Sequence, residues 1–162
     1  MCNVISGPQT SEDPIKIRPK LSAQAEREAR RDSRLRRART CYGHLAGVAG
    51  VALMDKMISL GWLEEDPLPA TGNRVGYNLS IIGHKAMADC GVEVATAAKT
   101  TSKFAFCCLD WTERRQHLGG ALGRAATFFL SEHGFVGQSP GTREVTLKGS
   151  PEVWLDGAGA QG

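Results

Sequence analysis

The sequence predicts an α+β fold, mostly α, made of two tandem copies of one unit behind a basic helical arm. Two matched anchors predict the duplication. His44-Leu45-Ala46-Gly47 returns as His117-Leu118-Gly119-Gly120, and the helix-ending Gly61 returns as Gly134, in both cases 73 residues later. A constant period at two separated anchors is the signature of an internal repeat.

Composition limits the class of protein. The net charge of +3 is modest, but basic residues concentrate between Lys16 and Arg39, which leaves the rest of the chain mildly acidic. The five cysteines are odd in number and follow no framework-like spacing, which argues against a secreted disulfide scaffold. The sequence has no signal-peptide pattern and no run of roughly 18 apolar residues. We therefore expect a cytoplasmic protein without a membrane partner.

The chain divides by composition into a body and its flanking segments. Turn-favouring residues without apolar periodicity predict a disordered leader, and a basic stretch that starts at the N-cap Ser22 predicts a helical linker. Glycine and alanine at the end predict a flexible tail. The expected parts are the leader over 1–20, the linker over 21–40, the duplicated domain over 41–150 with repeats at 41–91 and 108–155, and the tail over 156–162.

The first repeat is expected to open with a helix over 42–60, because apolar residues recur at spacings of three and four. A glycine supplies its stop. Two strands follow, over 62–64 and 74–79, with a proline- and glycine-rich loop between them. Ser80 then caps a short helix over 81–90.

The second repeat is expected to follow the same plan. Residues 92–103 are predicted to be helical, and the apolar stretch 104–109 is predicted to be buried. Asp110 then caps a long helix that ends at Gly134, and Glu113 occupies the N3 position of a capping box.

A hairpin closes the second repeat as it does the first. Strands are predicted over 135–136 and 143–147, and Ser150 and Pro151 indicate the start of another helix. Each repeat therefore has the order of a winged-helix unit, a helix followed by a two-stranded β-wing, and we expect two winged-helix-like repeats. The first helix carries a single cation, Lys56, and is therefore a poor reader of the DNA major groove.

The most specific signals are two long motifs, Thr40-Cys41-Tyr42-Gly43-His44-Leu45-Ala46-Gly47 and Cys108-Leu109-Asp110-Trp111-Thr112-Glu113-Arg114-Arg115-Gln116-His117-Leu118. In this order and spacing they resemble the C-terminal region of a subset of ArsR-type winged-helix transcriptional regulators. The likeness covers residues 36–149. It implies a helix-turn-helix regulator that binds DNA and forms a homodimer, or a mixed dimer with a related regulator. No motif requires a reaction, so we expect no enzyme and no catalytic residues.

Two departures from that pattern matter. The family has Asp where this chain has Gly43, and its DNA-reading winged helix needs more chain than the 40 residues before Cys41. We therefore expect a truncated C-terminal half, responsible for dimerisation and effector response, whose DNA contact is weak or lost. The alternatives are an interaction module that does not bind DNA and forms mixed dimers with a full-length regulator, and a small metal or ligand sensor.

The basic arm supplies the candidate DNA contacts. Several arginines there would bind phosphates in a salt-dependent, sequence-neutral manner. No aromatic residues are interleaved with them, so stacking on single strands is not indicated. The alternative is a solvated charged helix that links two domains. The candidate residues are Arg30, Arg31, Arg34, Arg36, Arg37 and Arg39.

Cysteines and histidines in the two motifs are candidate zinc ligands, and zinc is the one cofactor that the sequence suggests. Cys41 and His44 would lie on one helical turn, and Cys108 and His117 open the second copy. The alternative is that the cysteines are small buried hydrophobes and the histidines form hydrogen bonds between the repeats. A redox role for the adjacent Cys107 and Cys108 is a further alternative.

The other motif residues are predicted to be structural. Asp110 caps a helix, Trp111 packs between the repeats, and Glu113 pairs with His117 four residues later. The full set is Tyr42, Asp110, Trp111, Glu113, Arg114 and Arg115.

Overall fold

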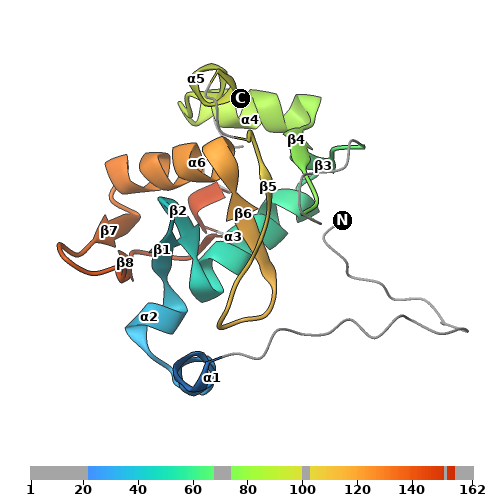
Figure 1. Ribbon diagram of the computed structural model, residues 1–162. Coiled ribbons are helices and arrows are strands. Elements are labelled where there is room, and N and C mark those ends of the chain that lie inside the picture. The colour runs from blue at the N-terminus through green and yellow to red at the C-terminus, as the bar shows by residue number, and fades with distance from the viewer. Residues whose placement is uncertain (1–21, 68–73, 100–102, 152, 156–162) are drawn as a thin grey trace, which may run out of the picture.

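In the computed structural model, the described residues (22–67, 74–99, 103–151 and 153–155) form helices that alternate with four two-stranded antiparallel hairpins (Figure 1). The α+β prediction is confirmed, whereas the predicted leader and tail lie outside the described residues. In chain order the elements are α1 (Ala23–Arg30), α2 (Arg34–Arg37), β1 (Arg39–Cys41), β2 (His44–Ala46), α3 (Gly47–Ser59), β3 (Leu63–Glu65), β4 (Tyr77–Leu79), α4 (Ile81–Asp89), α5 (Val94–Ala98), β5 (Phe106–Leu109), β6 (Gln116–Gly119), α6 (Gly120–Glu132), β7 (Val136–Gln138) and β8 (Val145–Leu147).

The order hairpin, helix, hairpin occurs twice. β1–β2, α3 and β3–β4 correspond to β5–β6, α6 and β7–β8. The helices α3 and α6 each have 13 residues and begin at Gly47 and Gly120, which keep the period seen in the sequence. A hairpin therefore precedes each long helix as well as following it.

The predicted helix over 42–60 is wrong at its start, because the turn after β1 and then β2 occupy residues 42–46. Tyr42 and Gly43 form the turn between them, with φ of 49° and 85°. Positive φ at both central positions gives a turn whose twist matches that of antiparallel strands and cannot continue a helix. Gly47 then opens α3 at φ 77°, where a Cβ atom would lie 2.4 Å from the Arg36 carbonyl oxygen.

The second predicted long helix is wrong in the same way. Residues 110–115 form a loop between β5 and β6, and α6 begins only at Gly120. The Asp110 carboxylate does accept the backbone N–H groups of Thr112 and Glu113, at 3.0 and 3.1 Å, as a helix cap would. These bonds close a turn instead of starting a helix, and the other half of the capping box is absent, because Glu113 binds Arg36 and the Asp110 N–H donates to the Arg115 carbonyl.

The other predicted strands and helices of the two repeats are present with altered bounds. The Ser80 hydroxyl caps α4 by accepting the Gly83 N–H at 2.9 Å, and the later hairpins form near the predicted places. In the described part of the predicted helix 92–103, α5 is the only helix. The arm starts at the cap Ser22 but breaks at residues 31–33 into α1 and α2. No helix in the described part of the chain is both long and apolar enough to cross a bilayer.

The two repeats exchange their packing partners. α3 packs against β6, and α6 packs against β2, so each long helix lies on the first hairpin of the other repeat (Figure 1). The later hairpins are exchanged too, since isolated bridges join Arg39 to Glu144 and Gly76 to Phe106. The apolar core lies at this junction, around Leu122, which is fully buried.

Candidate metal centre

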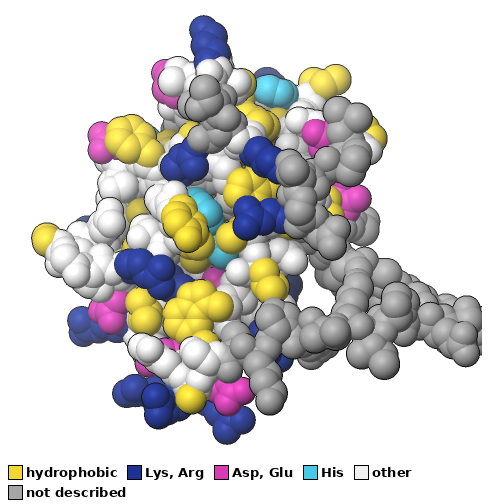
Figure 2. Space-filling model, viewed as in Figure 1, with side chains coloured by type: hydrophobic (Ala, Val, Ile, Leu, Met, Phe, Trp, Pro, Cys, Tyr) yellow, Lys and Arg dark blue, Asp and Glu magenta, His cyan; other side chains and the backbone are white. Residues whose placement is uncertain are grey.

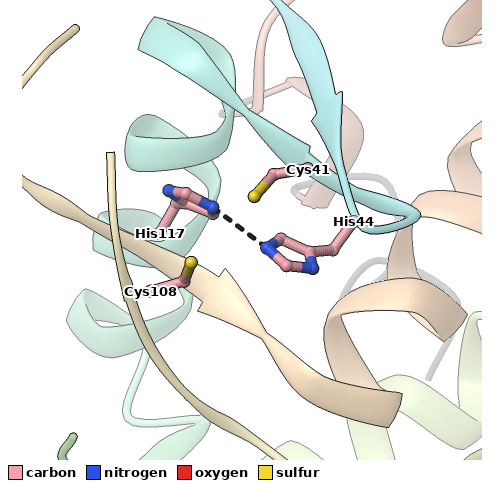
Figure 3. A group of neighbouring side chains, drawn as sticks. All are labelled: Cys41, His44, Cys108 and His117. Atoms are coloured by element: carbon pink, nitrogen blue, oxygen red, sulfur yellow. Dashed lines mark hydrogen bonds between the residues drawn. The ribbon is translucent and has the colours of Figure 1, made fainter. Parts of the chain in front are cut away.

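The four predicted zinc ligands converge at the junction of the repeats (Figure 3). One ligand atom from each of Cys41, His44, Cys108 and His117 lies within 4.8 Å of all the others. The cysteine and the histidine of each repeat are direct cross-strand partners, on β1–β2 and on β5–β6. Each first hairpin therefore contributes one Cys–His pair to a common cluster.

The unequal sequence spacings of the two pairs have a simple structural cause. Cys41 and His44 flank a two-residue turn, whereas Cys108 and His117 flank a longer hairpin loop. The prediction that the first pair shares a helical turn is wrong, because the two residues face each other across β1–β2. A cross-strand pair keeps its geometry whatever loop connects the strands, so the longer spacing does not disrupt the cluster.

The histidines form the inner part of the cluster. His44 and His117 are 2% and 1% exposed, and their Nε2 atoms lie 3.0 Å apart. Neither Nδ1 atom has a hydrogen-bond partner among the described residues. Buried polar atoms normally have such partners, so two unpaired nitrogens in one cluster require an explanation.

The cysteines form the outer part of the cluster. Cys41 and Cys108 are free, half-buried thiols. The hydrogen bond with Cys108, and those with His117 and His44, hold the pKa of Cys41 well below its usual range. The same thiol–thiol hydrogen bond, together with burial, raises the pKa of Cys108. The cluster therefore favours the thiolate form of Cys41, and the thiolate is the form that binds metals.

The donor set fits a zinc-class ion. Two thiolates and two imidazoles form a tetrahedral Cys2His2 site with bonds of about 2.3 Å to sulfur and about 2.0–2.1 Å to nitrogen, which places ligand atoms roughly 3.3–3.8 Å apart. The cluster spans at most 4.8 Å, with the Nε2 atoms at 3.0 Å. Small side-chain shifts would therefore bring all four atoms to tetrahedral positions.

A buried carboxylate lies behind one of the histidines. Asp110 is fully buried, and its Oδ2 atom accepts the Gly47 N–H at 2.7 Å. The same oxygen lies 3.4 Å from Nδ1 of His117, which is close but too long for a well-formed hydrogen bond. Carboxylates in this position orient metal-bound histidines.

The other oxygen of Asp110 binds the arm. Oδ1 accepts a hydrogen bond from Nη2 of Arg39 at 2.7 Å. It also accepts hydrogen bonds from the backbone N–H and the hydroxyl of Thr112. Burial alone would raise the pKa of Asp110, but the Gly47 N–H, the Arg39 guanidinium and the other donors together lower it to about 2. Asp110 is therefore charged at neutral pH, and Arg39 is its counter-ion.

The predicted DNA contacts separate into two groups. Arg39 is 1% exposed and lies 4.4 Å above the Trp111 ring, so DNA cannot reach it. Arg36 donates two hydrogen bonds to Glu113, at 2.8 and 3.1 Å. Arginine side chains gather over the α1–α2 end of the molecule (Figure 2). The exposed ones are Arg30, Arg31, Arg34 and Arg37, of which Arg31 pairs with Glu28 and Arg37 with Asp32.

The motif residues predicted to be structural have varied roles. Glu113 binds Arg36, not His117, because no helix forms there to bring residues four apart together. Tyr42 is a turn residue with 90% of its surface exposed. Arg114 is also exposed and has a φ of 54°. Arg115 pairs with Asp55 of α3 at 2.7 Å.

Sequence reasoning missed one polar link beside the centre. The Thr127 hydroxyl accepts the Leu45 N–H and donates to the Gly123 carbonyl, both at 2.8 Å, and so fixes α6 to the strand that carries His44. A threonine inside an apolar helix gives no signal for this role. The equivalent position in α3, seventy-three residues earlier, is Met54.

One of the comparisons with known proteins finds a relative. No family model matches the chain, and no solved structure matches it. It is 30% identical over 141 residues to YdfF of Bacillus subtilis (strain 168), named as an uncharacterized HTH-type transcriptional regulator. The alignment covers 86% of this chain and 58% of YdfF, so the chain spans less than two thirds of the relative. The chain is therefore a distant homologue of a protein named as such a regulator.

Proposed function

We propose that this chain is the effector-responsive part of a cytoplasmic HTH-type transcriptional regulator of ArsR-like type, and that its effector is a zinc-class metal ion. One observation carries the proposal: cross-strand Cys–His pairs from two repeats meet with all ligand atoms within 4.8 Å. The homology to YdfF supports the regulatory context. The order of a long helix and then a hairpin in each repeat supports the winged-helix-like description.

The donor set favours a regulatory role over a catalytic one. Four protein ligands complete a tetrahedral zinc site and leave no position for water or a substrate, unlike the three-ligand sites of zinc enzymes. Because each repeat supplies two ligands, a bound ion would join β1–β2 to β5–β6. Metal binding would therefore stabilise the exchanged packing of α3 and α6, and its free energy would add to that of folding.

DNA binding by the arm is a second, weaker part of the proposal. Arg30 and Arg34 are exposed and form no ion pair with another described residue, and Arg31 and Arg37 lie beside them. Phosphate contacts from such residues would be salt-dependent and insensitive to sequence. We propose that this arm adds affinity, while sequence-specific reading belongs to a helix-turn-helix element of the regulator or of its dimer partner.

The test is metal stoichiometry. The reduced protein is equilibrated with zinc, freed of excess ion and analysed by elemental analysis, and cobalt is substituted to record thiolate charge-transfer and tetrahedral ligand-field absorption. We expect one ion per chain and loss of both signals in Cys41→Ser and Cys108→Ser. Cys90→Ser is the matched control, since Cys90 is also a half-buried free thiol but lies outside the cluster. A reduced, folded protein that binds no zinc would disprove the proposal.

A further inference from the structure

Asp110 lies between the metal centre and the basic arm, and each of its oxygens serves one side. We propose that Asp110 is a positioning residue that couples metal occupancy to the order of the arm. The inference rests on the proposed metal centre. It assigns to Asp110 a function that the helix-cap prediction did not include.

On the metal side, Asp110 sets the state of the His117 ring. Its Oδ2 atom is held by the Gly47 N–H at 2.7 Å and lies 3.4 Å from Nδ1 of His117. A negative charge at this position favours the tautomer with the proton on Nδ1. Nε2, which faces the other three ligands, is then free to bind a cation. A cation on Nε2 would strengthen the attraction between the Nδ1–H and the carboxylate, so we expect the contact with Oδ2 to shorten.

On the arm side, Asp110 holds a buried guanidinium that reaches back into α2. Nη2 of Arg39 donates a hydrogen bond to Oδ1 of Asp110 at 2.7 Å. Nη1 of Arg39 donates to the Thr112 hydroxyl at 3.1 Å and to the Leu35 carbonyl at 3.2 Å. Leu35 belongs to α2, so the guanidinium bridges the arm helix and the 110–115 loop. A displacement of the carboxylate toward His117 is therefore transmitted to the arm.

The coupling is one-sided. The residue two positions after the cysteine is Asp110 in the second hairpin and Gly43 in the first. His44 accordingly has no carboxylate behind its Nδ1, which is buried and without a hydrogen-bond partner among the described residues. The arm contacts the 110–115 loop, the side that kept the carboxylate, both through Arg39 and through the Arg36–Glu113 pair.

The test combines zinc affinity with hydrogen exchange of the arm in the full chain. In the wild-type protein, we expect saturating zinc to slow exchange of the Arg37, Ala38 and Thr40 amides at least about fivefold. These amides donate to Ser33, Arg34 and Arg143. Amides of α4, which does not touch the cluster, serve as the internal control and should not change. In Asp110→Asn, zinc affinity should fall about 10–100-fold, and saturating zinc should no longer slow the arm.

The outcomes separate this inference from the proposed function. Absence of zinc binding by the wild-type protein would disprove the metal centre itself. Zinc binding that leaves wild-type arm exchange unchanged would overturn the coupling and leave the centre intact, and this outcome needs no variant to fold. Equal zinc affinities of Asp110→Asn and wild type would likewise overturn the positioning role. A cobalt spectrum that keeps its tetrahedral pattern in Asp110→Asn, at lower affinity, would distinguish lost positioning from a misfolded site.

Discussion

His44 and His117 occupy equivalent positions of the two repeats, and their Nε2 atoms lie 3.0 Å apart. The helix of the opposite repeat passes close to each ring. A Cβ atom at Gly50 of α3 would lie 3.5 Å from the Cβ of His117, and one at Gly123 of α6 would lie 3.1 Å from the Cβ of His44. The histidine pair therefore lies at the centre of a nearly symmetric junction, where the proposed metal site adjoins the closely packed helices.

Zinc should stabilise the folded protein. At a free zinc concentration about 100 times the dissociation constant, the free energy of unfolding should rise by about 2.7 kcal/mol, which corresponds to an increase in Tm of about 5–10 °C for a chain of this size. Differential scanning calorimetry with zinc, and then with a chelator, measures the shift. Cys90→Ser should behave like the wild type, and an equal shift in a Cys41→Ser/Cys108→Ser protein would contradict the assignment of the ligands.

Gly50→Ala should destabilise the protein even though alanine favours helices. A Cβ atom at Gly50 would lie 2.4 Å from the Leu45 carbonyl oxygen, so the strand before α3 must move. We expect a loss of about 1–3 kcal/mol in urea unfolding, typical of overpacking, in place of the gain of about 1 kcal/mol that an open helical site would give. Val48→Ala, on the exposed side of α3, is the control and should stay within about 0.5 kcal/mol.

The two ion pairs that fix the arm should differ strongly in their contributions. Arg39→Met leaves the buried Asp110 carboxylate without its counter-ion, a change that typically costs about 3–5 kcal/mol. Arg36→Gln breaks a pair whose side chains are 31% and 14% exposed, so we expect a smaller loss, on the order of 1 kcal/mol. Urea unfolding of the two variants gives the comparison. Equal losses would mean that Arg39 does not neutralise Asp110.

Thr127→Val should be costly for a conservative change. The variant keeps the shape of the side chain but leaves the buried Leu45 N–H without its acceptor, which we expect to cost about 1–3 kcal/mol. Chemical denaturation measures the loss. Thr96→Val, at an exposed position of α5, provides the comparison, and its stability should change little. A Thr127→Val protein as stable as the wild type would show that the hydroxyl is replaceable there.

DNA binding by the arm should be weak and independent of sequence. Fluorescence anisotropy with a duplex from upstream of the gene and a scrambled duplex should give equal affinities that fall steeply with salt. Arg30→Gln/Arg34→Gln should reduce the slope of log affinity against log salt by about 0.9 for each lost phosphate contact. A clear preference for the upstream duplex would contradict the proposal, because this chain would then read DNA sequence itself.

The sequence located the candidate ligands better than the elements that carry them. Cys41 and His44 were recognisable as a pair from their residue types and spacing, and the repeat supplied the second pair. The strands were missed because β1 and β2 have only three residues each, too few for an alternating pattern. Tyr42 and Gly43 gave no prediction of a turn, since the small apolar residues after them fit a helix equally well.

Local sequence patterns could not predict the roles of the buried charged residues. Arg39 ends a run of similar arginines, and only tertiary structure distinguishes it, by placing Asp110 beside it from 71 residues away. The capping-box pattern at Asp110 correctly indicated that the carboxylate would bind nearby N–H groups. It could not indicate that Arg39 and Gly47, both distant in sequence, would complete the set of donors.

The placement of one Cys–His pair on each first hairpin has a consequence for how such a site can diverge. A chain with a single repeat would hold half of the donors, and two such chains facing each other would complete the same set at a twofold axis. When both repeats lie in one chain, the two Cys–His pairs are always held close together, and no association between chains is needed. Occupancy of the proposed metal site would then depend on the ion concentration and not on the protein concentration. The presence of both repeats in one chain also allows their sequences to differ. A symmetric dimer must carry the same residue at both turns, whereas this chain carries Gly43 at one and Asp110 at the other.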